Sequence, residues 1–113
     1  MKEIDTLEAY SRFKPESCVF VISVDKKDKA NGMIAGWHMK CSHKPPLFAV
    51  ALKKTGNTHK LIRESKEFVI AVANKELEKE LFYFGHTSGR DKDKFKETNI
   101  ETVPAKYIKS FLI

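Results

Sequence analysis

Three short apolar runs constrain the fold of this chain more than any other feature. They cover residues 18–24, 47–52 and 68–73, and they are rich in β-branched or aromatic side chains. Runs of this length are typical of strands buried on both faces, whereas a membrane-spanning helix needs about 20 apolar residues. We expect a strand at each run, and a fourth, weaker strand over residues 33–39, which Gly36 interrupts.

Two helices are expected among these strands. The first begins at Asn57 or Thr58, because either side chain can cap a helix start. The second covers residues 74–84, with apolar side chains on one face and Gly85 as its stop. The order strand, strand, strand, helix, strand, helix favours a β-rich α+β barrel or sandwich. The length of 113 residues indicates a single domain, residues 1–113.

The charge is uneven along the chain. The net charge is +6, and residues 25–66 contain ten basic and three acidic side chains, a local charge of +7. Such a stretch favours an anionic partner such as a phosphate or an acidic surface, and a solvated lysine-rich face is the alternative. Nucleic acid is not expected, because no helix presents a basic stripe and no aromatic RNA-binding motif is present.

The first residues and the cysteines indicate a cellular compartment. Residues 1–5 lack the apolar stretch of a signal peptide, and Cys18 and Cys41 are too few for a disulfide framework. We therefore expect a cytoplasmic protein with reduced thiols and no membrane contact. Residues 111–113 form an apolar cluster that needs cover from the core or from another subunit, and a homodimer is the simplest solution.

Metal and nucleophile chemistry find little support. The four histidines, at positions 38, 43, 59 and 86, do not stand with Cys41 in a known ligand spacing, so no metal is expected. Cys41 is a conceivable nucleophile, and an inert thiol is the alternative. The glycine-rich fingerprints of dinucleotide and P-loop sites are absent.

A phosphate site is the remaining possibility. Residues 34–37 contain small side chains that let backbone amides approach a ligand, and residues 56–58 open a helix whose start suits a phosphate. Lys53 precedes that helix, and Trp37 can add an aromatic face. This set suits a nucleotide-like cofactor. The alternative is that Thr58 only caps the helix, that Gly36 only relieves a bend, and that Trp37 belongs to the core.

Four motifs, in this order and at this spacing, resemble the flavin reductase-like, flavoredoxin-type FMN-binding family. They are residues 31–37 (NGMIAGW), residues 41–47 (CSHKPPL), Thr58 with Ile62, and residues 88–95 (SGRDKDKF). The resemblance implies a split β-barrel that binds FMN non-covalently, as a homodimer with the site near the subunit interface. It also implies that NAD(P)H is the electron source.

The resemblance also assigns site residues. Lys94 matches the lysine near the isoalloxazine and is the catalytic candidate, because a positive charge there favours flavin reduction. The alternative for Asn31 is a purely structural role in a hairpin turn. The alternative for Lys94 is a solvated position beside Asp91 and Asp93. The implied cofactor-binding positions are Asn31, Ile34, Ala35, Gly36, Trp37, Cys41, Ser42, Asn57, Thr58, Ser88, Gly89 and Lys94.

Two departures from the family pattern affect function. Ile34 and Gly36 stand where hydroxyl side chains are frequent, and the chain is shorter than the family at its C-terminus. The expected function is an FMN-binding redox protein, a flavin reductase or flavoredoxin-like carrier that passes electrons from NAD(P)H to a flavin, metal complex or protein. The alternative is a non-catalytic dimerising or binding module of the same fold. A basic module for an acidic partner is a third option.

Overall fold

A three-stranded antiparallel sheet forms the centre of the computed structural model, which describes residues 3–11 and 17–113. Its strands stand in the order β2 (Ala30–Ala35), β1 (Val19–Val24) and β5 (Val69–Val72). All six residues of β1 are buried, because the strand is paired on both edges and packed on both faces. The expected buried strand at residues 18–24 is therefore confirmed.

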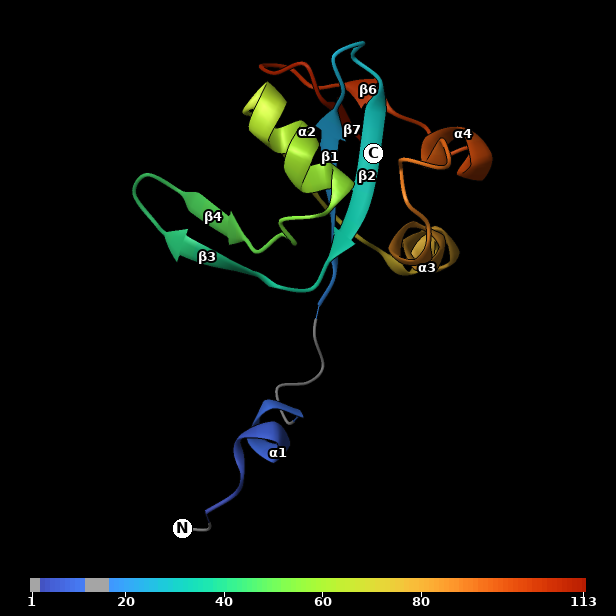
Figure 1. Ribbon diagram of the computed structural model, residues 1–113. Coiled ribbons are helices and arrows are strands. Elements are labelled where there is room, and N and C mark those ends of the chain that lie inside the picture. The colour runs from blue at the N-terminus through green and yellow to red at the C-terminus, as the bar shows by residue number, and fades with distance from the viewer. Residues whose placement is uncertain (1–2, 12–16) are drawn as a thin grey trace.

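Two smaller sheets accompany this centre. The hairpin of β3 (His38–Ser42) and β4 (Leu47–Val50) projects to one side of the body (Figure 1). Two short strands, β6 (Val103–Pro104) and β7 (Phe111–Leu112), pair near the end of the chain. The short helix α1 (Thr6–Ser11) stands away from the sheets (Figure 1).

The remaining helices flank the central sheet. Helix α2 (Asn57–Ser65) packs against β1 and β2. The 3-10 helix η1 (Lys75–Leu77) leads into α3 (Glu78–His86), and α3 and α4 (Lys94–Thr98) both lie beside β2 (Figure 1). Within the described ranges, no helix combines the length and apolar character needed to cross a bilayer.

The structure corrects several expected strands. The run at residues 47–52 yields only β4, and its side chains are mostly exposed because β4 pairs with β3 alone. Strand β5 is partly exposed for a similar reason, since β1 is its one partner in the central sheet. A single strand over residues 33–39 is wrong: β2 ends at Ala35 and β3 begins at His38, with a bend at Gly36.

The turn after β1 ends before Asn31, because β2 begins at Ala30. Asp25 accepts hydrogen bonds from the backbone amides of Lys27 and Lys29, at 2.8 Å and 3.0 Å, and so closes the turn before β2. Asn31 therefore lies inside β2, opposite Ser23, and its alternative place in a hairpin turn is wrong. In this register the Asn31 side chain, which belongs to β2, contacts residues of β1 and of α2.

The helices also differ from expectation at their ends. Helix α2 does begin at Asn57, but its N-cap is Gly56, so Thr58 is not the cap. Asn74 caps η1, since its side chain accepts a hydrogen bond from the Leu77 amide at 3.1 Å. Gly85 is not the stop, because α3 continues one residue further, to His86. Helices α1 and α4 were not expected at all.

Aromatic side chains hold the core together. Phe84 packs edge-on against Phe20 and Phe95, with ring centroids 5.4 Å and 5.1 Å away, on the side of the sheet that α3 and α4 cover. Phe111 and Ile113 pack against the same cluster. The cover that the apolar tail needs therefore comes in part from the chain's own core.

Gly32 is the point of closest approach between β2 and this cluster. A Cβ atom at Gly32 would lie 2.6 Å from Cε2 of the Phe84 ring. We expect Gly32→Ala to lower the free energy of unfolding by about 1–3 kcal/mol, because the core must shift to accept the methyl group. Urea unfolding measures this. Gly85→Ala, where no atom lies within 4 Å, is the control, and equal midpoints for the two variants would contradict the packing argument.

Candidate functional site

Two adjoining cavities lie along β2, between the start of α2 and the segment that leads into α4. Their volumes are about 200 Å³ and about 140 Å³. Four residues line both cavities, so the two are halves of one depression. The shared residues are Asn31, Asn57, Gly89 and Lys94.

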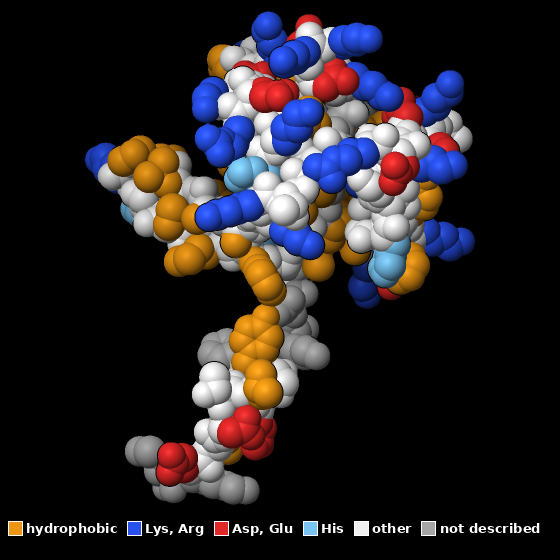
Figure 2. All heavy atoms as spheres, viewed as in Figure 1, with side chains coloured by type: hydrophobic (Ala, Val, Ile, Leu, Met, Phe, Trp, Pro, Cys, Tyr) orange, Lys and Arg blue, Asp and Glu red, His pale blue; other side chains and the backbone are white. Residues whose placement is uncertain are grey.

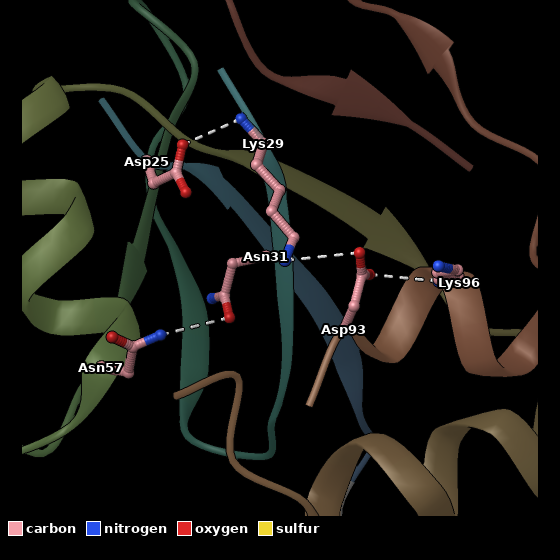
Figure 3. Close-up of polar contacts among 6 residues, drawn as sticks. All are labelled: Asp25, Lys29, Asn31, Asn57, Asp93 and Lys96. Atoms are coloured by element: carbon pink, nitrogen blue, oxygen red, sulfur yellow. Dashed lines mark hydrogen bonds and ion pairs between the residues drawn. The ribbon is translucent and has the colours of Figure 1, made fainter. Parts of the chain in front are cut away.

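Asn31 is the structural centre of this depression. Its Nδ2 donates to Oγ1 of Thr58 at 3.0 Å and to Oγ of the fully buried Ser23 at 3.3 Å. Its Oδ1 accepts a hydrogen bond from Nδ2 of Asn57 at 3.4 Å (Figure 3). One amide side chain thereby connects β1, β2 and the first turn of α2.

The start of α2 offers backbone donors to the larger cavity. Gly56 is the N-cap, and no side chain caps the first turn. Gly56, Asn57 and Thr58 all line that cavity, and Lys53 lies at its edge. Free amides and the positive end of the helix dipole favour an anion such as a phosphate.

The loop after α3 closes the depression from the other side. A Cβ atom at Gly89 would lie 2.0 Å from Oδ1 of Asn31 and 3.2 Å from Nδ2 of Asn57, so only glycine fits this contact. Nη2 of Arg90 donates to the carbonyl oxygen of Thr55 at 2.9 Å. This bond fastens the loop to the segment that precedes α2.

Lys94 contributes a buried ammonium group. Only 5% of the residue is exposed, and its Nζ donates to the carbonyl oxygen of Phe84 at 3.1 Å. Burial lowers the pKa of Lys94 to about 8, because the charged form loses its hydration. The alternative of a solvated lysine is wrong.

Asp93 positions the lysine through its backbone. Its Oδ1 accepts a hydrogen bond from the Lys96 amide at 3.1 Å and caps α4, and Oδ2 lies 3.4 Å from Nζ of Lys29 (Figure 3). The cap bond and Lys29 together lower the pKa of Asp93. The carboxylate of Asp93 therefore interacts with the start of α4 and with Lys29, not with the ammonium group of Lys94.

The structure brings some of the predicted site residues together and leaves others apart. Ala35 faces the core, and Gly36 forms the bend before β3. Trp37 is 63% exposed, so it is not a core residue, and it borders a separate apolar cavity on the hairpin. Cys41 and Ser42 lie on β3, outside both cavities. Seven predicted residues line the larger cavity: Asn31, Ile34, Asn57, Thr58, Ser88, Gly89 and Lys94.

Sequence reasoning missed several lining residues. Phe84 belongs to the core and also lines the larger cavity. Its position on the apolar face of the expected helix predicts only the core role. Arg90 lines neither cavity but fastens the loop, and in the sequence only its place in the resemblance marks it. The other missed residues of the larger cavity are Met33, Leu52, His59, Gly85 and Thr87.

The donor set suits a phosphate ester and not a metal ion. Hydroxyl, amide, backbone N–H and ammonium groups line the larger cavity. The smaller cavity also has the carboxylates of Asp25 and Asp93, which accept hydrogen bonds from backbone amides. In the part of the chain that the structure describes, no three His, Cys, Asp or Glu side chains stand close enough to hold a metal ion. The volumes accommodate a phosphate and a short polyol, but they lie below the 300–1,000 Å³ that is typical of pockets that enclose a whole cofactor.

The sequence and the fold of this chain are similar to those of several known proteins. The sequence model of the flavin reductase like domain matches residues 14–112. High molecular weight rubredoxin of Moorella thermoacetica is 35% identical over 82 residues, which are 72% of this chain and 36% of that protein. Flavoredoxin of Desulfovibrio vulgaris (Miyazaki F) has a TM-score of 0.88 and 27% identity, over 97% of this chain and 60% of that chain. An FMN-binding protein from Thermus thermophilus has a TM-score of 0.81 and 20% identity, over 99% of this chain and 61% of that chain.

These similarities cover most of this chain but only about a third to three fifths of the relatives' own lengths. The antiparallel α+β arrangement is that of the split-barrel flavin reductase-like proteins, so the fold class expected from the sequence is confirmed. The family match includes every residue that lines the two cavities. The chain therefore belongs to the flavin reductase-like family.

Proposed function

We propose that this protein binds FMN non-covalently and transfers electrons from NAD(P)H through it to a flavin, a metal complex or a protein. One observation carries the proposal: a buried ammonium group and an uncapped helix start converge on one depression. Both features favour a bound anion. Membership of the flavin reductase-like family supports FMN as the molecule that supplies it.

The residues present fit the phosphate end of FMN. The amides at the start of α2, with Asn57, Thr58 and Lys53, would hold the phosphate, and Ser88 adds a hydroxyl group. Ile34 and Lys94 remain for the ring end. Because the cavities are too small for the whole cofactor, the ring system needs a further surface, and the resemblance assigns Trp37, Cys41 and Ser42 to it.

Bound FMN would supply hydride acceptance and electron donation. The protein contributes binding and an electric field. Lys94 in its charged form favours reduction of a flavin beside it, because it offsets the negative charge that reduction adds. Its loss of hydration makes that charge more effective than an exposed lysine would be.

A homodimer and a cytoplasmic location complete this proposal. The exposed apolar hairpin supports the first, and the two free cysteines agree with the second. The same hairpin favours the alternative function, a dimerising module that holds flavin weakly or not at all. A purified protein that shows no flavin absorbance after addition of FMN and removal of the unbound FMN would decide for the module.

Thr58→Val tests the phosphate end of the site. Valine keeps the shape of the side chain but removes the hydroxyl group that lies between Asn31 and the cavity. We expect FMN affinity to fall about five- to tenfold, the effect of about one lost hydrogen bond. Fluorescence titration with FMN measures this. Thr102→Val, outside both cavities, should leave the affinity unchanged, and equal weakening by both substitutions would remove Thr58 from the site.

Lys94 makes the affinity for FMN depend on pH. In the free protein its pKa is about 8, and a bound anion favours the charged form and raises that pKa. FMN binding should therefore weaken as the pH rises above about 8. Titrations from pH 7 to pH 10 check this. Lys94→Met should weaken binding at pH 7, flatten the profile and lower the midpoint potential, and an unchanged profile would refute the role of Lys94.

The same pKa affects the stability of the free protein. Between about pH 8 and pH 10.5 the unfolded lysine keeps a proton that the folded lysine has lost, so stability rises with pH in this window. Lys94→Met should stabilise the free protein by about 1–3 kcal/mol at pH 7, and the gain should shrink toward pH 10.5. Urea unfolding of both proteins at several pH values measures it, and a gain that is constant with pH would be contrary to this account.

A further inference from the structure

The larger cavity has two walls, which come from separate parts of the chain. The first wall belongs to residues 53–58, which lead into α2, and the second is residues 87–89, the loop after α3. Helix α2 and the segment from α3 to α4 lie on opposite sides of β2 (Figure 1). A ligand that bonds to both walls depends on the spacing between them, because a displacement of about 1 Å already weakens a positioned hydrogen bond.

Each wall is held in shape by a turn of its own. In the first wall, the Gly56 amide donates to the carbonyl oxygen of Lys53 at 2.9 Å. Beside the second, the carbonyl oxygen of Ser88 accepts hydrogen bonds from the amides of Asp91 and Lys92, at 3.1 Å and 3.2 Å. These local bonds fix the shape of each wall but not the distance between the two walls.

Two contacts join the walls, one at the floor of the cavity and one at its rim. At the floor, Asn31 bonds to the start of α2 and packs against Gly89. At the rim, Nη2 of the exposed Arg90 donates to the carbonyl oxygen of Thr55 at 2.9 Å. Among the described residues, this is the one recorded hydrogen bond between residues 53–58 and residues 87–92. The floor contact alone leaves the angle between the walls free, and the rim contact fixes it.

A buried hydroxyl group at the first wall has a proton to donate. Thr58 is 5% exposed, and its Oγ1 accepts the hydrogen bond from Asn31. No acceptor for the Thr58 proton is recorded within the described ranges, and Thr58 lines the larger cavity. A phosphate oxygen that lies between the walls is the kind of acceptor that this proton lacks.

We propose that Arg90 is a positioning residue that makes the larger cavity selective for a phosphate group. By holding the Thr55 carbonyl oxygen, it keeps the first turn of α2 and the Ser88 hydroxyl group at the spacing at which one phosphate bonds to both. Arginine suits this role because its guanidinium group stays charged and donates in a fixed plane. Arg90 lines neither cavity, so its effect is indirect. The inference rests on the proposed function and extends it to the residue that sets the spacing of the phosphate ligands.

Arg90→Met tests the inference, with Arg63→Met as the matched control. Both arginines are exposed, but Arg63 lies in the last turn of α2 and lines neither cavity. Fluorescence titrations with FMN and with riboflavin, which lacks the phosphate, measure the selectivity. Arg90→Met should lower the FMN affinity about five- to tenfold and the riboflavin affinity less than about twofold, because only the phosphate depends on the spacing. Arg63→Met should change neither affinity. An unchanged FMN affinity in Arg90→Met, or an equal loss for both flavins, would overturn the inference.

The dependence on salt separates positioning from simple attraction by the charge of Arg90. In about 0.5 M sodium chloride, exposed charges are screened over a few ångströms. A loss of FMN affinity that comes from the wall spacing should persist at this salt concentration, relative to the wild-type chain. A loss that disappears in salt would assign Arg90 to attraction alone and would contradict the positioning role.

Hydrogen exchange with inorganic phosphate as the probe tests the spacing without a flavin. Phosphate should slow the exchange of the first amides of α2 in the wild-type chain and in Arg63→Met, and much less in Arg90→Met at the same concentration. The inference fails if phosphate gives no protection in the wild-type chain, or equal protection in all three proteins. A protein in which this protection depends on Arg90 but which binds no FMN would refute the proposed function and leave the inference intact.

Discussion

The hydrogen bonds of one side chain, Asn31, organise the whole depression. The side chain emerges from β2 and contacts the buried Ser23 of β1 and both Asn57 and Thr58 at the start of α2. Because Asn31 connects strand and helix, the uncapped amides of α2 face the cavity rather than solvent. Gly89 then fits against the same side chain, so the loop after α3 depends on it as well.

The charges around the depression favour an anionic ligand. The basic stretch of the sequence surrounds the start of α2, and Figure 2 shows Lys and Arg side chains gathered over that part of the molecule. Lys94 differs from these lysines because it is buried and its one recorded side-chain hydrogen bond goes to a backbone carbonyl oxygen. The carboxylate of Asp93 is engaged elsewhere, so a bound anion is the natural partner of this charge.

The sequence predicts those parts of the structure in which a local pattern and the tertiary environment agree. The run that forms β1 is apolar at nearly every position, and the strand is buried throughout. The sequence indicates an interruption at Gly36 but does not divide residues 33–39 between two strands, because apolar residues continue on both sides of it. The burial of Lys94 was missed, since alternating charges such as Asp93-Lys94 indicate solvent and only the packing of α4 against β2 removes it. Seven of the site residues nevertheless converge, because the resemblance carries information on tertiary contacts that periodicity lacks.

The contact between Gly89 and Asn31 has a consequence for how quickly a ligand exchanges. Both residues line both halves of the depression, and Arg90 fastens the loop through the Thr55 carbonyl oxygen. A molecule long enough to occupy both halves would lie against this fastened loop. The Arg90–Thr55 hydrogen bond would then affect the rate at which such a molecule leaves, separately from the groups that hold it in place.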